Sequence, residues 1–238
     1  MTLSEQYPYR TELHAHSSPA SSCSIFKTAS LVKAYDECGI DTLVLTNHLS
    51  PYMPCFGDKE KSMELYFKDY DLAVKTAKNR QITVILGCEL RFTDLNNDYL
   101  LYGASREELA SYYDWIDRGI EAFSEQFRRE DHLLLQAHPF RDDMVRVDPA
   151  LLDGIETFNM NPDHNSRVAL AARYAKEHDM IVTAGTDSHK PGQEGLAGIR
   201  TKERIADSAM LVRILKSRDY LFEIGGCLVD SYDTAIVL

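Results

Sequence analysis

The chain has 238 residues, which suits one large domain or two small ones and lies close to the usual length of a β/α barrel. Its 37 acidic and 26 basic residues give a net charge of −11, which argues against a broad nucleic-acid-binding surface. The charge does not exclude a small phosphorylated substrate, because bound metal ions reverse the local charge. No apolar run approaches the roughly 18 residues that would span a membrane.

The five cysteines are scattered and form no C-x-x-C pair, so neither a zinc knuckle nor a redox motif is predicted. An odd number of cysteines in a chain without a signal peptide indicates reduced thiols. We therefore expect a cytoplasmic protein that is not attached to a membrane. The sequence does not predict its oligomeric state.

Strands and helices are expected to alternate along the chain. Apolar spacing at Leu31, Val32 and Tyr35 predicts one helix, with Thr28 able to cap its start and Gly39 after its end. In chain order we expect strand 10–15, helix 28–38, strand 42–46, helix 59–78, strands 82–88 and 98–103, helix 106–128, strands 132–137 and 154–158, helix 166–178, strand 180–185, a Gly-rich loop at 190–198, helix 206–217 and strand 220–224.

The predicted strands are continuous apolar runs, which is typical of a parallel sheet covered by helices. No linker rich in Pro, Gly or Ser divides the chain, so one domain over residues 1–238 is expected. The residues by themselves therefore predict an α/β fold with parallel strands and outer helices.

Two histidines end the first predicted strand. Residues two apart on a strand point to the same face, so His14 and His16 project together. Two such imidazoles can share one metal ion, which binds histidine nitrogen at about 2.1 Å. An isolated H-x-H is more often a pair of unrelated histidines, so the rest of the chain has to decide.

Other predicted strands end in the same kinds of residue. Five of the eight histidines fall at strand ends, whereas chance would scatter them over helices and loops. In parallel β/α folds the C-terminal strand ends form the site. Imidazole and carboxylate ligands suit zinc, manganese or iron, and Glu89 is the candidate to bridge two ions. The metal ligands predicted from these strand ends are His14, His16, His48, Glu89, His138, Asp187 and His189.

Taken in order, these segments resemble the polymerase-and-histidinol-phosphatase (PHP) superfamily. The resemblance is carried by Leu-His-Ala-His at 13–16, Thr-Asn-His at 46–48, Gly-Cys-Glu at 87–89, Ala-His-Pro-Phe-Arg at 137–141, Asp-Gly-Ile-Glu-Thr-Phe-Asn at 153–159 and Gly-Thr-Asp-Ser-His at 185–189. It implies a distorted (β/α)7 barrel, a trinuclear metal site at the C-terminal strand ends, and hydrolysis of phosphate esters.

The chain departs from the family pattern at several positions. Many members carry an Asp or His ligand shortly after the H-x-H, where this chain offers hydroxyls such as Ser21 and the thiol of Cys23. Asn47 stands where the family usually has Asp. Asn159 stands where relatives often have His or Cys, and on that resemblance it is predicted as a further metal ligand. The resemblance therefore implies two or three divalent ions (Zn, Mn or Fe) without deciding the number.

Further titratable residues are weighed as ligands and assigned other roles. His164 lies in a loop before a helix, where a surface or capping role is preferred. Cys23 and Asp98 are less favoured ligand candidates. His132 begins a strand and His178 ends a helix, so both are expected to be structural.

Arg141 follows His138 by three residues, and its planar guanidinium suits a phosphate. The alternative is a surface ion pair with Asp142 or Asp143. Further candidates for phosphate binding are Arg91 and Lys190. The predicted catalytic residues are His138, Asp187 and His189, with His138 and His189 as alternative proton donors to the leaving group.

We therefore expect a cytoplasmic, metal-dependent phosphatase acting on a small phosphorylated metabolite. One alternative is a phosphodiesterase or nuclease of the same fold, which the acidic charge disfavours. The other is a metal-binding regulatory domain without catalysis. Assays of phosphate esters with Mn²⁺, Zn²⁺ or Fe²⁺ would separate them.

Overall fold

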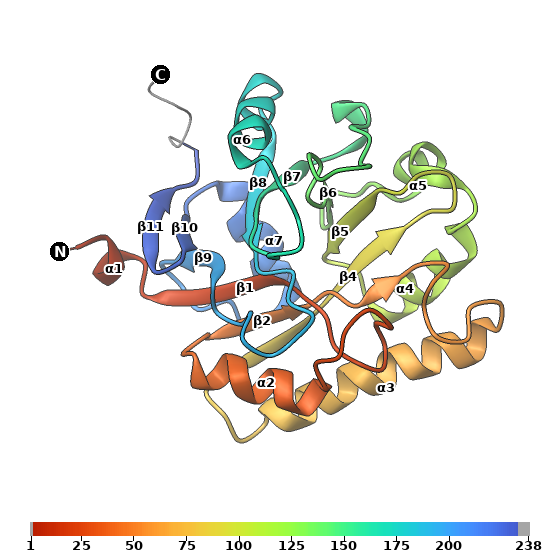
Figure 1. The fold of residues 1–238 in the computed structure, drawn as a ribbon, viewed down its shortest axis with the longest axis horizontal. Helices are drawn as coiled ribbons and strands as arrows, with labels where there is room; N and C mark the ends of the chain where they lie inside the picture. Colours follow the sequence, from red (N-terminus) through yellow and green to blue (C-terminus); the bar gives the residue numbers. More distant parts are fainter. Residues whose placement is uncertain (1, 233–238) are drawn as a thin grey trace.

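The computed structural model describes residues 2–232, so residue 1 and residues 233–238 of the predicted domain lie outside the described part. Within that part, eleven strands form one strongly curled sheet (Figure 1). The strands are β1 (Tyr9–Ala15), β2 (Thr42–Leu45), β3 (His48–Leu49), β4 (Thr83–Arg91), β5 (Asp98–Tyr102), β6 (Leu133–Gln136), β7 (Gly154–Asn159), β8 (Ile181–Gly185), β9 (Ala197–Thr201), β10 (Leu221–Ile224) and β11 (Cys227–Asp230).

Helices cover the outer faces of this sheet. In Figure 1, α2 and α3 run below β1, β2 and β4, while α6 lies beside β7 and β8. The helices are α1 (Leu3–Gln6), α2 (Thr28–Glu37), α3 (Lys59–Ala77), α4 (Arg106–Tyr112), α5 (Gly119–Phe127), α6 (Val168–Glu177) and α7 (Ser208–Ser217), with 3-10 turns η1 (Tyr113–Trp115) and η2 (Pro149–Leu151). Among residues 2–232, no helix is both long and apolar enough to cross a bilayer.

The sheet runs in the order β11-β10-β9-β1-β2-β4-β5-β6-β7-β8, with β3 paired to β4. Its curl brings the end of β8 back to the end of β1, where Ala15 and Ser188 form a parallel bridge. The Asp187 amide donates to the His14 carbonyl at 2.8 Å, and the His16 amide donates to the Ser188 carbonyl at 3.0 Å. The first and eighth strands are therefore neighbours at the rim where the predicted ligands lie.

The prediction of a wholly parallel sheet is wrong, because the sheet is mixed. Strands β1, β2 and β4 are parallel, as are β6, β7 and β8, but β5 runs antiparallel to both β4 and β6. Only residues 92–97 separate β4 from β5. A parallel crossover needs roughly a dozen residues, so this connection makes a hairpin.

The C-terminal strands extend the sheet beyond β1. Strand β9, which begins inside the predicted Gly-rich loop, pairs antiparallel with β1 and β10. Strand β11 was not predicted, and it pairs with β10 across Gly225 and Gly226, which both have positive φ (55° and 82°). Adjacent glycines with positive φ make a tight hairpin turn, so the Gly-Gly pair was the available signal.

The predicted helix over 106–128 is wrong in its middle. Helix α4 ends at Tyr112, the turn η1 follows, and α5 starts afresh at Gly119. Gly119 has φ +78°, and a Cβ there would lie 2.5 Å from Oδ2 of Asp94. A left-handed residue cannot continue an α-helix, so the chain turns at this point.

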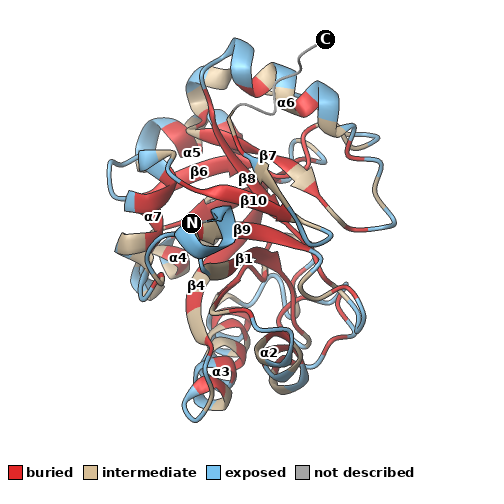
Figure 2. Cartoon of the chain, turned by 90° about the vertical axis from the view of Figure 1, so that its left-hand side faces the viewer, coloured by how far each residue is buried: buried red, intermediate tan, exposed pale blue. Residues whose placement is uncertain are grey.

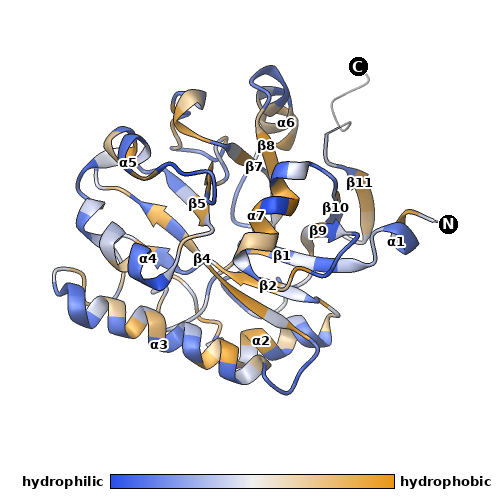
Figure 3. Cartoon of the chain, turned by 180° about the vertical axis from the view of Figure 1, so that it is seen from behind, coloured by the Kyte–Doolittle hydropathy of each residue, from blue (hydrophilic) through white to orange (hydrophobic). Residues whose placement is uncertain are grey.

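Apolar side chains fill the space between the sheet and its helices. Leu31, Val32 and Tyr35 of α2 are all buried, as their spacing predicted. Figure 2 shows the strands buried along most of their length, and Figure 3 shows hydrophobic stretches on strands such as β4 and on parts of helices α2, α3 and α7. The sheet therefore forms a rigid support for the side chains at its rim.

Candidate metal centre

Strand β1 carries the H-x-H motif into the interior of the curled sheet. His14 and His16 are fully buried, and their Nε2 atoms lie 3.0 Å apart. The bridge between Ala15 and Ser188 sets this pair beside Asp187 and His189. The expectation that closure of the sheet would make the two pairs neighbours is therefore confirmed.

Glu89, at the end of β4, lies between four imidazoles. Its carboxylate oxygens are 3.2 Å from His14 Nε2, 3.3 Å from His16 Nε2, 3.0 Å from His48 Nδ1 and 3.4 Å from His138 Nε2. Burial by itself would raise the pKa of the Glu89 carboxyl, but His14 and His48 outweigh it and hold that pKa well below its usual range. Glu89 is thus a buried carboxylate in the central position predicted for a bridging ligand.

Asp187 is a second buried carboxylate beside the H-x-H pair. Its Oδ1 lies 3.2 Å from His16 Nε2 and 3.4 Å from His14 Nε2. Burial opposes ionisation, yet His14 and the hydrogen bond from His16 hold the pKa of Asp187 well below its usual range. Both central carboxylates therefore favour the charged form, which suits cation binding.

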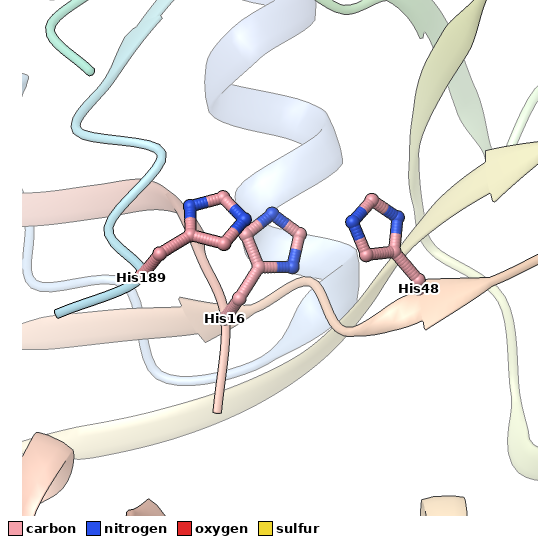
Figure 4. Close-up of side chains that lie close together, drawn as sticks. All are labelled: His16, His48 and His189. Atoms are coloured by element: carbon pink, nitrogen blue, oxygen red, sulfur yellow. The ribbon is translucent and has the colours of Figure 1, made fainter. Parts of the chain in front are cut away.

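Three histidines from different segments converge on one side of the centre (Figure 4). The ring centroid of His16 is 4.5 Å from that of His48 and 4.5 Å from that of His189. One nitrogen from each ring falls in a group whose atoms all lie within 4.8 Å of one another. Three nitrogens this close match the number of protein ligands that a catalytic zinc-type site uses.

Hydrogen bonds at Nδ1 determine which ring nitrogen His14 and His189 present to the centre. His14 Nδ1 lies 2.9 Å from Glu156 Oε1, and His189 Nδ1 lies 2.8 Å from the Asp187 carbonyl oxygen. Each acceptor requires a proton on Nδ1, so the Nε2 lone pair of the ring is left for another partner. Acceptors behind the ring are the usual support of histidine ligands to metals.

The residues present fit a metal site. The described residues include four groups of three candidate ligands, and within each group the ligand atoms all lie within 4.8 Å of one another. Glu89 belongs to two of these groups. His48 Nδ1, Glu89 Oε1, His138 Nδ1 and His164 Nδ1 are buried without a hydrogen-bond partner. The His48 and His164 nitrogens each lie near a carboxylate oxygen, but at angles that make no hydrogen bond. Buried polar atoms normally have partners, so this cluster of orphans indicates ligand positions.

The positions that depart from the family pattern form a hydrogen-bonded support behind His16. Ser21 Oγ lies 3.3 Å from His16 Nδ1 and donates to Asn47 Oδ1 at 2.9 Å. Asn47 Nδ2 donates in turn to the buried carboxylate of Asp69 at 3.0 Å. Ser21 and Asn47 therefore orient a predicted ligand through protein contacts, and Asp69 on α3 anchors them.

Sequence reasoning assigned His164 to the surface, and the structure instead places it at the centre. Its Nδ1 lies 3.2 Å from Asp187 Oδ2, and it forms a candidate ligand group with His138 and Asp187. Asp98, at the start of β5, joins His48 and Glu89 in another group. The loop 161–165 folds back over the strand ends, so that His164 reaches Asp187. The Asn and Asp residues of this loop form no periodic pattern from which its path could have been predicted.

Glu156 on β7 was also missed. It is fully buried, with Oε1 on His14 and Oε2 accepting from the His138 amide at 3.1 Å and from Asn159 Nδ2 at 2.9 Å. The available signal was a charged residue inside an apolar strand. A buried carboxylate of this kind needs partners, and the partners here are predicted site residues.

Asn159 lies in the site, but protein groups engage both ends of its amide. Its Nδ2 donates to Glu156 and also to Asp187 Oδ2 at 3.1 Å, while its Oδ1 accepts from the Asn161 amide at 3.1 Å. The structure therefore shows it holding two carboxylates in place. Its role as a metal ligand remains a prediction.

A cavity of about 320 Å³, which we call the chamber, opens above the buried histidines. Arg141 lines it, 3.1 Å from His164 Nε2 and 3.9 Å from Asp98 Oδ2. In the described part of the chain Arg141 does not pair with Asp142 or Asp143, and Asp142 pairs instead with Arg167. The predicted residues that line this chamber are His48, Glu89, Arg91, His138, Arg141, Asp187 and His189.

The other two predicted phosphate-binding residues are placed differently from Arg141. Arg91 lines the chamber but is held by both oxygens of Asp98, with Nε 2.5 Å from Oδ1. Lys190 does not line the chamber, and its Nζ lies 3.3 Å from Asp163 on the surface. The structure thus places Lys190 outside the lining of this chamber, and its role in phosphate binding remains a prediction.

The remaining titratable residues occupy peripheral positions. Cys23 lines the chamber. Desolvation and, to a smaller extent, the negative charge of Glu89 raise the pKa of its thiol to about 12. His132 is buried against Asp131 at 2.9 Å, and the ring of His178 packs on Tyr174 with centroids 4.5 Å apart. Both histidines contact other protein side chains, as expected of structural residues.

Solved structures with similar folds support this architecture. A two-domain Bacteroides vulgatus protein that contains a predicted PHP-like metal-dependent phosphoesterase matches with a TM-score of 0.61 and 16% identity, over 92% of this chain and 66% of that one. This chain therefore spans less than two thirds of the Bacteroides protein. At such low identity the likeness shows the fold alone.

Two further structures match over most of their own length. An amidohydrolase from Chromobacterium violaceum with bound sulfate has a TM-score of 0.55 and 15% identity, covering 87% of this chain and 96% of that one. A candidate metal-dependent phosphoesterase from Bifidobacterium adolescentis has a TM-score of 0.52 and 16% identity, with the same coverages.

No protein with a curated description matches the sequence. A family model of the PHP domain does match, and it extends from residue 12 to residue 229. The matched segment includes every predicted ligand, from His14 on β1 to His189 after β8. Because this match spans most of the 238 residues, the chain belongs to the PHP domain family.

Proposed function

We propose that the chain is a metal-dependent phosphatase that hydrolyses a small phosphomonoester. The observation that carries this proposal is the convergence of buried imidazoles and carboxylates below a cavity that also exposes Arg141. The names of the similar Bacteroides and Bifidobacterium structures, which refer to metal-dependent phosphoesterases, support the same reaction class.

The ligands proposed for two or three divalent ions are His14, His16, His48, Glu89, His138, Asp187 and His189, with His164 and Asp98 added by the structure. Bound zinc, manganese or iron would supply the positive charge that polarises a phosphate ester and activates water. Glu156, Ser21 and the Asp187 carbonyl keep the rings of His14, His16 and His189 turned toward the centre.

Arg141 is proposed to bind the phosphate. Its side chain is 23% exposed and lines the chamber. Its polar contacts there are with His164 and, at a longer distance, with Asp98. A guanidinium can hold two phosphate oxygens at once. Arg91 instead keeps Asp98 in place, because that carboxylate already occupies its fork. The catalytic roles of His138, Asp187 and His189, including the choice of proton donor, remain predictions.

The test combines metal analysis with a substrate panel. The full chain purified without chelators is expected to carry at least two transition-metal ions, and to hydrolyse phosphomonoesters when Mn²⁺, Zn²⁺ or Fe²⁺ is added. Hydrolysis restricted to phosphodiesters would assign the phosphodiesterase alternative. A protein that binds the ions but hydrolyses nothing is a metal-binding domain, and one that binds no ion contradicts the ligand set.

A further inference from the structure

The chamber has one aromatic wall beside its polar and charged walls. Among the described residues that line it, Tyr52 is the one aromatic side chain other than histidine. Its exposed fraction is 66%, so most of the ring is free to meet a ligand. An isolated exposed aromatic on a surface needs no explanation, but this one faces the cavity that contains the candidate metal ligands.

The backbone around Tyr52 is held in place on both sides. Its amide donates to Ser50 Oγ at 3.2 Å, and Ser22 Oγ donates to its carbonyl at 3.0 Å. The next residue, Met53, is only 4% exposed and its amide donates to the Ser50 carbonyl at 3.2 Å. The loop is therefore anchored while the ring projects from it.

The ring itself has a fixed neighbour. The guanidinium carbon of Arg91 lies 5.8 Å from the Tyr52 ring centroid, within the range of a cation–π contact. Arg91 is in turn bound through its fork to Asp98, which is 1% exposed. This series of contacts from Asp98 through Arg91 positions the aromatic wall relative to the centre, because Asp98 also belongs to a candidate ligand group.

We propose that Tyr52 determines substrate specificity by stacking on a planar ring in the leaving group. The substrate class is then a phosphomonoester whose alcohol carries an aromatic or heteroaromatic ring near the ester bond. The inference rests on the proposed phosphatase function, with the phosphate at Arg141 and the ring at Tyr52 in one cavity of about 320 Å³. An offset aromatic stack favours such a ligand over a saturated one by about 3-fold to 10-fold.

A matched pair of substrates isolates the ring. Benzyl phosphate and cyclohexylmethyl phosphate have leaving alcohols of the same size and kind, and they differ in whether the ring is flat and aromatic. With the Mn²⁺-loaded full chain, kcat/KM is expected to favour the benzyl ester by about 3-fold to 10-fold. Tyr52→Phe should keep that preference. Tyr52→Leu should raise KM for the benzyl ester more than for the cyclohexylmethyl ester, so that the ratio of the two kcat/KM values falls to about 1.

Phe56 provides the control in the same loop. It is 38% exposed and packs on Tyr113 with centroids 5.5 Å apart, but it does not line the chamber. Phe56→Leu should therefore behave as the parent. Equal kcat/KM for the two esters in the parent, or an unchanged preference in Tyr52→Leu, overturns the inference.

A binding measurement separates this inference from the proposed reaction. Calorimetric titration of the Mn²⁺-loaded chain with benzylphosphonate and cyclohexylmethylphosphonate, which cannot be hydrolysed, requires no turnover. Tighter benzylphosphonate binding that Tyr52→Leu abolishes supports the ring site even if neither ester is hydrolysed, an outcome in which only the phosphatase proposal fails. Equal binding of both phosphonates by the parent overturns the ring site.

Discussion

Arg141 is the cation of the chamber that no carboxylate holds closely, since Asp98 Oδ2 is 3.9 Å away and is already paired with Arg91. Charge-assisted hydrogen bonds to phosphate contribute roughly 1.5–3 kcal/mol, and about 1.4 kcal/mol is tenfold in rate. Arg141→Ala is therefore expected to lose roughly 10-fold to 100-fold in kcat/KM while it keeps its metals. Arg141→Lys should recover part of the loss, because it restores the charge without the fork.

The control for Arg141 is Lys190→Ala. Lys190 carries the same charge and follows His189 directly, but it pairs with Asp163 outside the chamber. Steady-state kinetics on the best substrate should leave this variant close to the parent. If Arg141→Ala also turns over like the parent, Arg141 does not bind the phosphate.

Glu156 is expected to set the metal affinity of His14 without touching an ion itself. In Glu156→Gln the new side-chain amide has two possible orientations. If its oxygen faces His14 Nδ1, its NH₂ group faces the His138 amide and Asn159 Nδ2, which are both donors, so the amide is expected to flip. The flipped amide donates to Nδ1 and puts the proton on Nε2, which then cannot bind a metal. Chelator competition should show about 10-fold to 100-fold weaker metal binding.

Glu12→Gln is the matched control for Glu156. Glu12 is also fully buried on β1, but it accepts hydrogen bonds from backbone amides and from the hydroxyls of Tyr35 and Thr186, with no imidazole partner. The metal affinity of the Glu12→Gln variant should stay within about 3-fold of that of the parent. ¹⁵N shifts of His14 in the metal-free protein, recorded at a pH where the ring is neutral, should report a changed tautomer only in Glu156→Gln. Equal metal affinity in both variants would refute the positioning role.

At the scale of single elements, Gly119 tests why α4 and α5 are separate helices. In Gly119→Ala the new Cβ meets Asp94 at 2.5 Å and also holds a left-handed backbone, which together should cost about 1–3 kcal/mol of unfolding free energy. Gly57→Ala separates these causes, because Gly57 has φ +100° and no atom within 4 Å of an added Cβ. Thermal denaturation should show a larger loss for Gly119; similar losses would mean that the Asp94 contact is unimportant.

At the scale of the whole molecule, metal ions are expected to link strands that are far apart in sequence. The candidate ligands come from β1, β3, β4 and β5 and from the segments that follow β1, β6, β7 and β8, which meet at one rim of the sheet. Ligands that bind only the folded state stabilise it by mass action. Removing the ions with a chelator should therefore lower Tm, and adding Mn²⁺ should restore it. A Tm that is the same in both states contradicts a shared centre.

The size of that Tm difference should depend on pH. Burial disfavours the charged form of His14, but Glu156 and Asp187 outweigh it and raise its pKa well above the usual value. In the metal-free chain this imidazolium stabilises the fold at low pH, and its contribution is lost as pH rises through the raised pKa. Metal binding needs the neutral ring, so protons compete at low pH. The Tm gain from Mn²⁺ should thus grow as pH rises, and a gain that shrinks would contradict this linkage.

Much of the candidate site follows from local sequence rules. Strand alternation puts His14 and His16 on one face, and parallel strands carry their C-terminal residues to a common rim. These rules predicted Glu89, His138 and Asp187 as members of one cluster, and the structure brings them together. The same rules apply wherever a short apolar run ends in a metal-binding residue type.

Only the tertiary structure decided the members that depend on chain direction and loop paths. The direction of β5 follows from the short connection 92–97, and it brings Asp98 to the same rim. His164 reaches the centre because the loop after β7 folds inward, whereas Lys190 leaves it because the chain after β8 turns outward. Loop paths depend on contacts between distant segments, and no periodic pattern in the sequence encodes them. The strand ends therefore determined the chemistry of the centre, and long-range packing decided which loop residues complete it.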